Sequence, residues 1–345
     1  MSGCNVLIVG AGIAGMSAAM HLKRMGVEGV TVMERMSGDR YDRYHRTCGE
    51  AVSETAVRLS GIGRGCIVRD VDSIRITCGG VDINIPVEGH IIDRNGLLRA
   101  MREESGAEFV QGCVIGVKEA QDGFIVTSTA GEFRCRYLIG ADGAFSVVRK
   151  GMFGTSPEIR FPAVNNLVEG DSETTVLGFE VSTRYHGAYR WDFPGKQGLR
   201  SVGYECGTDD IPDHVERGIR FIVAGSDRTV VKGNCCLVGD AAMLINPICY
   251  GGIRAALLSG RKAAEAISSG DLSSYQAWVR KDVMFDRHFL DALMDFRSWE
   301  EADYLDSVRP FKGGYSLLRG FYAILRRPRW ANVYMSVWMA FRKGW

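Results

Sequence analysis

Residues Asn5–Gly15, which read NVLIVGAGIAG, decide the fold of this chain. The apolar run Asn5–Val9 is rich in β-branched side chains and is typical of a buried parallel strand. A glycine-rich turn follows it, then a helical pattern through Met25 and a second apolar run at Val30–Met33. This order predicts a strand–helix–strand unit with the glycines at its first turn.

The glycines of this turn have the spacing G-x-G-x-x-G, which indicates dinucleotide binding when it joins a strand to a helix. Gly10 permits the tight turn, Gly12 lets the backbone approach a pyrophosphate, and Gly15 lets the helix pack closely on the strand. Glu34 ends the second strand, where its carboxylate can accept hydrogen bonds from ribose hydroxyls. These residues predict a dinucleotide site that suits either FAD or NAD(P).

Two later segments favour FAD. Ile139–Arg149, IGADGAFSVVR, resembles the Asp-Gly motif of the aromatic-ring flavin hydroxylases, with Asp142 in its centre. Leu237–Ala242, LVGDAA, resembles the second Gly-Asp motif of the same flavoproteins, and Asp240 follows a buried strand, where it can hold a ribitol hydroxyl. The resemblance implies FAD, and we expect it to be non-covalent because no His or Cys stands in a recognisable attachment context. Gly61–Gly65 has a similar glycine spacing, but no strand precedes it, so we expect no second unit for NAD(P)H.

The middle and the end of the chain differ from this pattern. Thr174–Ser182, Gly187–Phe193 and Leu199–Glu205 alternate with period two between turn residues, which predicts an antiparallel sheet. From Ser273 onward the pattern is helical and rich in aromatic residues. We therefore predict an α/β fold with three parts: a Rossmann-type FAD-binding domain (1–72, 89–160 and 229–270), an inserted antiparallel-sheet substrate domain (73–88 and 161–228) and a helical C-terminal region (271–345).

Three segments resemble the geranylgeranyl reductases, a family of FAD-dependent oxidoreductases. Tyr189–Pro194, YRWDFP, with Gly198 after it, looks like their Y-x-W-x-F-P…G signature. Arg46–Ala51, RTCGEA, resembles their Arg-x-Cys-Gly segment beside the flavin, and Asn246–Ile253, NPICYGGI, resembles their Asn-Pro-x-x-x-Gly-Gly-Ile segment. The resemblance covers Asn5 to about Ser268. It implies FAD contacts at Ala14, Glu34, Cys48, Gly49, Ala51, Arg94, Val114, Asp240, Gly252 and Ile253.

The resemblance also implies an activity, the reduction of carbon–carbon double bonds in geranylgeranyl chains of lipids. Tyr189, Trp191 and Phe193 point to one face of their strand, which suits an isoprenoid-binding wall and equally an ordinary core. Reduced FAD would deliver hydride from N5, and the proton would come from Cys48, Tyr250 or water. Tyr250 stands where the family has a small residue, which places a bulky phenol near the flavin. The external electron donor stays open between ferredoxin and a nicotinamide.

Other readings of the sequence also stay open. One is a flavin monooxygenase that hydroxylates a small apolar or aromatic substrate, and another is a flavin-binding module without catalysis. The interval between Glu205 and Cys235 is short for the family, which predicts a shortened substrate domain. The net charge of +1 argues against nucleic-acid binding. The ten cysteines show neither C-x-x-C pairs nor zinc-finger spacing, so we expect no metal site and a reducing cytoplasm.

The segment Ser307–Trp345 contains no Asp or Glu, yet it contains eight Lys or Arg. Basic residues that alternate with Trp and Tyr are typical of helices that lie on an anionic membrane surface. Pro328 should divide the segment into two short helices, which suits lying flat better than spanning. We expect a protein peripheral to the inner face of the membrane. Helices packed over the substrate domain are the alternative.

Overall fold

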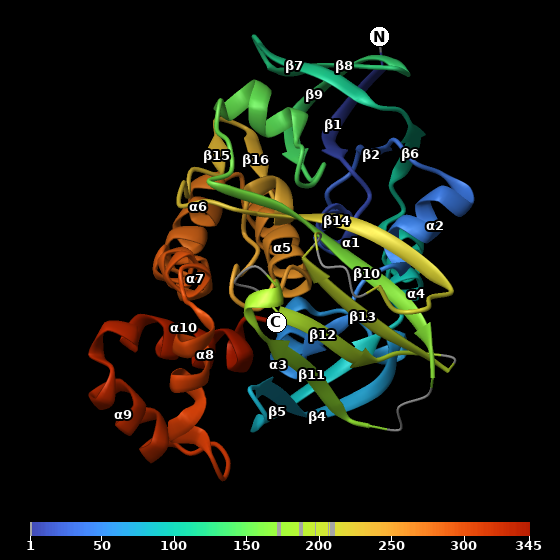
Figure 1. Cartoon of the computed structure of the whole chain (residues 1–345). Coiled ribbons are helices and arrows are strands. Elements are labelled where there is room, and N and C mark those ends of the chain that lie inside the picture. The colour runs from blue at the N-terminus through green and yellow to red at the C-terminus, as the bar shows by residue number, and fades with distance from the viewer. Residues whose placement is uncertain (1, 171–173, 186–188, 197, 206, 208–210) are drawn as a thin grey trace.

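Two eight-stranded β-sheets organise the chain in the computed structural model (Figure 1). The structure describes residues 2–170, 174–185, 189–196, 198–205, 207 and 211–345. The central strands of the first sheet are parallel, the second sheet is almost wholly antiparallel, and a lobe of C-terminal helices lies beside the second sheet. This architecture confirms the predicted α/β class, with an antiparallel sheet and a helical C-terminal region.

The first sheet has the parallel centre expected of a dinucleotide-binding domain. It contains β1 (Ser2–Val9), β2 (Val30–Glu34), β6 (Glu108–Gln111), β7 (Val114–Ala120), β8 (Gly123–Ser128), β9 (Gly131–Gly140), β15 (Val231–Lys232) and β16 (Cys235–Leu237). Strand β1 pairs in parallel with β2 and β9, which pair in parallel with β6 and β16. The apolar runs predicted as buried strands all lie in this sheet.

The parallel strands end at one edge of the first sheet. Gly10 follows β1 there, Glu34 ends β2, Asp142 lies just after β9, and Asp240 lies just after β16. Ligands of open parallel sheets bind outside the carboxyl ends of the strands. The motifs that are far apart in the sequence therefore meet at the edge where a dinucleotide is expected.

Helices pack beside this sheet and against one another. They are α1 (Ile13–Arg24), α2 (Gly38–Arg46), α3 (Glu54–Ser60), α4 (Arg94–Ser105) and α5 (Ile253–Ser269). Helix α1 packs against both α4 and α5. At the crossing of α1 and α5, a Cβ atom added to Gly260 would lie 2.4 Å from the carbonyl oxygen of Ala14. Only glycine allows these helices to approach so closely.

The second sheet brings together strands from the first and second thirds of the chain. It contains β3 (Ala51–Ser53), β4 (Ile67–Cys78), β5 (Val81–Ile92), β10 (Ile159–Glu169), β11 (Val176–Val181), β12 (Tyr189–Pro194), β13 (Leu199–Glu205) and β14 (Glu216–Ala224). The alternating patterns predicted β11, β12 and β13, although residues 187 and 188 of one pattern lie outside the described residues. The short interval before Cys235 holds β14, which pairs with β10 at the edge of the sheet.

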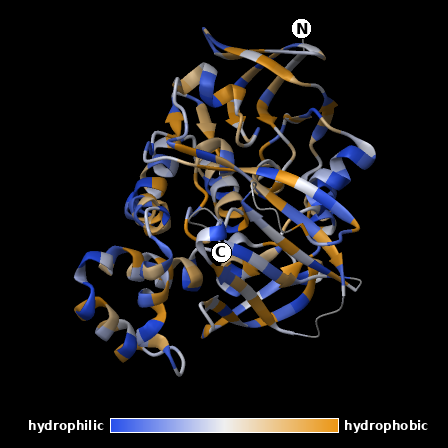
Figure 2. Cartoon of the chain, in the orientation of Figure 1, coloured by the Kyte–Doolittle hydropathy of each residue, from blue (hydrophilic) through white to orange (hydrophobic). Residues whose placement is uncertain are grey.

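The C-terminal helices are α6 (Leu272–Lys281), α7 (His288–Arg297), α8 (Glu301–Val308), α9 (Leu317–Arg326) and α10 (Ala331–Lys343). Pro328 lies in a short 3-10 turn between α9 and α10, at the predicted division. Figure 2 shows apolar and polar residues mixed along the helices of the C-terminal lobe, which α8, α9 and α10 form. Within the part of the chain that the structure describes, no helix combines the length and apolarity needed to cross a membrane.

The C-terminal lobe shares its hydrophobic core with the first sheet. Trp330, Val333 and Phe341 belong to the same continuous cluster of buried side chains as Leu7 and Ile8 of β1. The lobe is therefore packed onto the body of the molecule.

Candidate active site

In the glycine-rich turn, neighbouring atoms leave no space for a side chain at two of the glycines and leave space at the third. Gly10 has a φ of 102°, and a Cβ added there would lie 2.4 Å from the carbonyl oxygen of Ala141. A Cβ at Gly15 would lie 2.0 Å from the carbonyl oxygen of Gly10. A Cβ at Gly12 would meet only the ring of His45, at 3.7 Å. The turn thus requires glycine for packing at its ends, while Gly12 leaves room for a ligand at the start of α1.

Glu34 lies beside this turn at the end of β2. Its carboxylate accepts hydrogen bonds from the backbone N–H groups of Ala11, at 2.7 Å, and Met36, at 2.9 Å. The hydroxyl of Tyr41 donates to the carbonyl oxygen of Ala11, at 2.6 Å. The carboxylate therefore supports the turn, and its contact with a ribose stays a prediction.

Asp142 shapes the loop after β9. Its carboxylate accepts hydrogen bonds from the hydroxyl of Ser146, at 2.5 Å, and from the backbone N–H of Val147, at 2.7 Å. The guanidinium of Arg149 donates to the carbonyl oxygen of Ala241, at 2.9 Å. Arg149 thus ties the Asp-Gly loop to the Gly-Asp motif, and direct contact of Asp142 with the cofactor stays a prediction.

Asp240 faces the start of α5. A Cβ added to Gly252, the residue that precedes α5, would lie 3.6 Å from a carboxylate oxygen of Asp240. Burial raises the pKa of Asp240, and the positive charges of Arg94, Arg149 and Arg220 oppose that rise. The carboxylate and the helix N-terminus together offer acceptors and donors to one polar ligand.

Four basic side chains near the glycine-rich turn and Asp240 have buried nitrogen atoms without partners. Both ring nitrogens of His45, and the Nε atoms of Arg94, Arg149 and Arg220, make no hydrogen bond with the described residues. Burial lowers the pKa of His45 to about 2, and the charges of Arg94 and Arg220 add to that effect. Buried polar atoms are normally satisfied, so these atoms indicate a ligand with acceptor groups. The donor set fits the phosphates and the flavin oxygens of FAD.

A hydrogen-bond network joins Cys48 to the aromatic signature. The hydroxyl of Ser201 lies 3.2 Å from the carbonyl oxygen of Cys48 and 2.6 Å from the side-chain oxygen of Asn165. The indole N–H of Trp191 donates to the same Asn165 oxygen, at 3.0 Å. A Cβ at Gly49 would lie 3.0 Å from the ring of Phe193. Trp191 and Phe193 therefore support the Cys48–Gly49 segment.

Of the other residues predicted to contact FAD, Ala51, Val114 and Ile253 are each the first residue of a strand or helix, whereas Ala14 lies within α1. Ala14 is buried within α1, where a Cβ at Gly239 would meet its methyl group at 2.8 Å. Ala51 begins β3, Val114 begins β7 and Ile253 begins α5. The structure brings Ile253 close to Asp240 through Gly252, while Val114 belongs to the hairpin of β7 and β8.

Sequence reasoning missed Glu50, Arg220 and Asn165. Glu50 has a φ of 54° and accepts a hydrogen bond from the backbone N–H of Arg94, at 3.0 Å. Burial raises the pKa of Glu50 to about 7, although the ammonium of Lys196 lies 3.7 Å away. The positions of Arg220 and Asn165 depend on the pairing of β10 with β13 and β14, which local patterns do not reveal.

Tyr250 precedes the double glycine of the predicted flavin site and lines an apolar cavity. Its backbone has a φ of 51°, its ring stacks on that of Tyr189, and it also lies 5.2 Å from the ring of Phe161. The buried hydroxyl of Tyr250 makes no hydrogen bond with the described residues, and burial raises its pKa. The predicted bulky phenol beside the double glycine is therefore present, packed against the rings of Tyr189 and Phe161.

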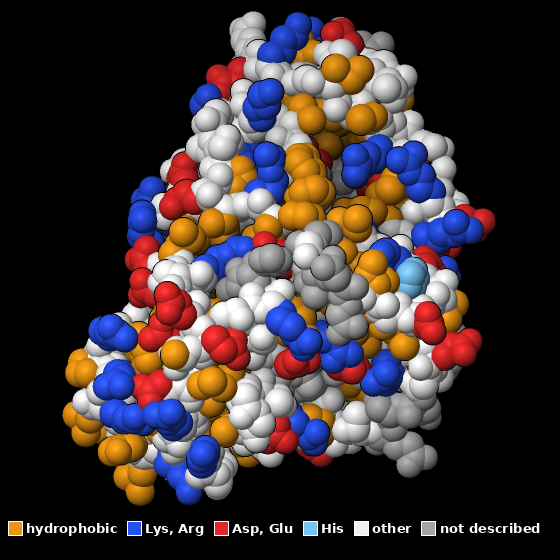
Figure 3. All heavy atoms as spheres, in the orientation of Figure 1, with side chains coloured by type: hydrophobic (Ala, Val, Ile, Leu, Met, Phe, Trp, Pro, Cys, Tyr) orange, Lys and Arg blue, Asp and Glu red, His pale blue; other side chains and the backbone are white. Residues whose placement is uncertain are grey.

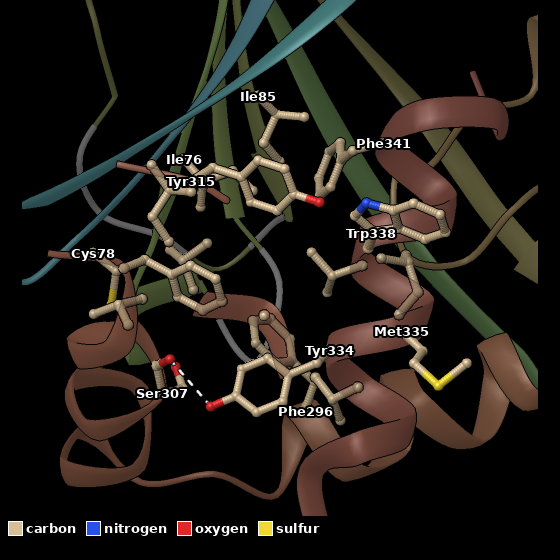
Figure 4. Close-up of a pocket in the computed structure, with 18 of the residues that line it drawn as sticks. Ile76, Cys78, Ile85, Phe296, Ser307, Tyr315, Tyr334, Met335, Trp338 and Phe341 are labelled. Atoms are coloured by element: carbon tan, nitrogen blue, oxygen red, sulfur yellow. Dashed lines mark hydrogen bonds between the residues drawn. The ribbon is translucent and has the colours of Figure 1, made fainter. Parts of the chain in front are cut away.

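The cavity has a volume of about 450 Å³ and lies between the second sheet and the C-terminal helices. Figure 4 shows Ile76 and Ile85 of the sheet on one side and Trp338 and Phe341 of α10 on the other. Nearly all its lining side chains are apolar or aromatic. Of the three aromatic residues predicted to line a substrate pocket, Tyr189 is in this lining, whereas Trp191 and Phe193 are not.

A model of the family described as "FAD binding domain" matches residues 3–52, which contain the glycine-rich turn and Glu34. Relatives match much more of the chain. Digeranylgeranylglycerophospholipid reductase 1 of Methanopyrus kandleri is 28% identical over 78% of this chain and 83% of its own. Digeranylgeranylglycerophospholipid reductase 2 of Methanothermobacter thermautotrophicus is 28% identical over 87% of this chain and 90% of its own. The chain is an FAD-dependent oxidoreductase related to the geranylgeranyl reductases.

Solved structures show that this oxidoreductase has a common flavoprotein fold. A geranylgeranyl bacteriochlorophyll reductase-like protein from Thermoplasma acidophilum superposes with a TM-score of 0.78 at 20% identity, over 98% of this chain and 100% of its own. The p-nitrophenol 4-monooxygenase of Pseudomonas putida superposes with a TM-score of 0.64 at 17% identity, over 99% and 98%. The fold is therefore shared between reductases and monooxygenases, and the cofactor of this oxidoreductase is FAD.

Proposed function

We propose that the oxidoreductase reduces carbon–carbon double bonds in the geranylgeranyl chains of a membrane lipid. The observation that carries this proposal is the apolar cavity whose lining includes Tyr189 and Tyr250, the latter directly before the double glycine in the sequence. An isoprenoid chain is a hydrocarbon that carries no polar groups. Its burial in an apolar cavity therefore contributes ~0.8 kcal/mol for each CH₂ taken from water. The names of the two relatives support a glycerophospholipid that carries such chains.

The reaction adds one hydride and one proton across each double bond. Reduced FAD, when bound, supplies the hydride. His45, Arg94, Arg220 and Asp240 hold the cofactor, and the cavity aligns the chain with it. Tyr250 supplies the proton to the second carbon, because the residue is part of the cavity lining and its hydroxyl has no hydrogen-bond partner among the described residues. Cys48 is the alternative donor, and it lies beside the guanidinium of Arg94 instead of in the cavity lining.

The same proposal places the enzyme at the inner face of the membrane, in contact with its lipid substrate. The C-terminal segment supports this location through its eight Lys or Arg and its lack of Asp or Glu after Asp306. Two electrons for each double bond come from an external donor, either ferredoxin or a nicotinamide. We also propose that the chain divides into an FAD-binding domain, an inserted substrate domain and a helical C-terminal region at the bounds predicted from the sequence.

Anaerobic reduction of the purified holoenzyme tests the reaction. The flavin is reduced with dithionite, then mixed either with a geranylgeranyl lipid in detergent or with oxygen and a phenol. Reoxidation by the lipid, with a product heavier by two hydrogens for each flavin, is the expected result. Hydroxylation of the phenol, without reaction of the lipid, would identify a monooxygenase instead. Repeating the reduction with ferredoxin and with NADPH identifies the electron donor.

A further inference from the structure

Helix α9 presents an unusual outer face. Leu318, Phe321 and Leu325 are exposed to 84%, 70% and 69%, and Tyr322 on the same helix is exposed to 58%. Single exposed apolar side chains are ordinary, whereas a group of them on one helix marks an interaction surface. We call Leu317, Leu318, Phe321, Tyr322 and Leu325 the outer face of α9.

The outer face continues into the cavity. Leu317 and Phe321 are exposed and also line the cavity, and Met335 of α10 is exposed to 53% and lines it too. Gly320 lines the same cavity from α9, and a Cβ added there would meet no atom within 4 Å. The cavity thus has a mouth between α9 and α10, and the mouth opens within the exposed apolar surface.

Net positive charge lies beside the outer face. Four arginines share the carboxylates of two aspartates, since Arg309, Arg326 and Arg327 pair with Asp306 and Arg329 pairs with Asp303. The side chains of Arg329 and Arg309 remain accessible to 71% and 61%. Figure 3 shows basic and apolar side chains side by side over the C-terminal lobe. Exposed apolar side chains beside a cluster of arginines match the interfacial region of an anionic bilayer.

We propose that the outer face of α9 docks on an anionic lipid bilayer and that the mouth between α9 and α10 admits an isoprenoid chain from it. The chain then moves from the hydrocarbon of the bilayer into the cavity without crossing water. The identity of the chain rests on the proposed function, whereas docking rests on the exposed apolar side chains of α9 and on the arginines beside them.

Co-sedimentation tests the docking surface. The full-length holoenzyme is mixed with vesicles of phosphatidylglycerol and phosphatidylcholine at low and high salt. We expect the Leu318→Asp, Leu325→Asp pair to weaken binding at least 10-fold, and Leu318→Ser with Leu325→Ser to weaken it less. Ile115→Asp is the matched control, because Ile115 is exposed to 64% on β7, which Figure 1 shows far from α9. If all variants bind vesicles equally, or if the control loses as much binding, the outer face of α9 is not the docking surface.

The mouth has its own test. Gly320→Phe should fill the mouth, and Gly320→Ala adds only a methyl group to open space. Vesicles that contain a lipid with a brominated isoprenoid chain should quench the fluorescence of Trp299 and Trp338, which line the cavity. We expect Gly320→Phe to bind vesicles normally and to lose this quenching and at least 10-fold of turnover, whereas the smaller Gly320→Ala change should reduce both much less.

The outcomes separate the two proposals. If the wild-type enzyme reduces no geranylgeranyl chain in detergent, the proposed function fails, while vesicle binding and quenching still decide the docking surface and the mouth. Normal quenching and turnover in Gly320→Phe would show that the chain does not enter the cavity between α9 and α10. Binding to a protein partner, with no binding to vesicles at either salt concentration, would overturn the bilayer as the occupant.

Discussion

The ring of Tyr250 stacks on the ring of Tyr189, with their centroids 4.8 Å apart and their planes inclined by 25°. Tyr250 comes from the loop that carries the double glycine, whereas Tyr189 comes from β12 of the second sheet. Both rings line the apolar cavity. The pair therefore lies where the cavity meets the flavin loop, and substitutions there separate the chemical and steric parts of the proposal.

Tyr250→Phe keeps the stacked ring and removes only the hydroxyl. If this hydroxyl donates the proton, turnover should fall by roughly 10²- to 10⁴-fold, the usual contribution of a general acid. The content of bound FAD, measured by absorbance, should not change. Cys48→Ser is the matched comparison, and we expect it to lose much less activity. Full activity in Tyr250→Phe with loss in Cys48→Ser would reverse the assignment.

Arg220→Gln should weaken FAD binding roughly 10- to 150-fold, because hydrogen bonds to charged groups contribute about 1.5–3 kcal/mol. Its guanidinium lies 3.6 Å from the centre of the Tyr44 ring, and its Nε has no partner among the described residues. Titration of flavin fluorescence measures the affinity. Arg217→Gln on the same strand is the control, since Arg217 donates to Asn166 instead. Equal weakening in both variants would point to general damage to β14.

Glu50 should make stability depend on pH. Its pKa in the folded protein is raised to about 7 by burial, so the folded state holds a proton that the unfolded chain releases near its ordinary value. Stability should therefore fall as the pH rises from about 4.5 to 7, and Glu50→Gln should be more stable above pH 7 by at most about 3 kcal/mol. Urea unfolding at pH 5 and pH 8 measures this difference, with Glu88→Gln, an exposed carboxylate, as the control. If the free energy of unfolding of Glu50→Gln depends on pH as steeply as that of the wild type, the raised pKa of Glu50 would be contradicted.

Trp191 and Tyr189 should behave differently, although they share one face of β12. Tyr189→Ala enlarges the cavity and should change the preference for chain length, measured with substrates of two lengths. Trp191→Phe loses the hydrogen bond to Asn165, which costs about 1 kcal/mol, and it should shift the flavin absorption spectrum through the Ser201–Cys48 contact. If Trp191→Phe alters chain length and leaves the spectrum unchanged, Trp191 belongs to the substrate wall after all.

Local patterns were enough to predict the flavin-binding part. The run before Gly10 and the strand before Asp240 are short, apolar and followed by turns, so their type and direction can be inferred without knowing their partners. The alternation of Tyr189, Trp191 and Phe193 likewise predicted a shared face. It could not predict what covers that face, because Tyr189 meets the cavity and Phe193 meets Gly49 through contacts between distant segments.

The strands β10 and β14 were not predicted individually, because they pair with each other across the intervening β11, β12 and β13. The strands β4 and β5 were not predicted either, although they form a hairpin of adjacent segments. The cavity was missed because it forms only where α9 and α10 pack beside the second sheet. The tail pattern predicted helices with a basic and aromatic character and a break at Pro328. It left open whether the helices pack on the body, and the structure shows that Trp330 and Phe341 do so while Leu318 does not.

The continuous core that joins Phe341 to Leu7 and Ile8 has a consequence for cooperativity. A lobe with a separate core would melt on its own, whereas this lobe and the parallel sheet should unfold in a single calorimetric transition. A lipid chain that binds only the folded cavity would then raise the melting temperature of the whole molecule, including the part that holds the flavin. Release of flavin on heating would report lipid occupancy at a distance from the lobe itself.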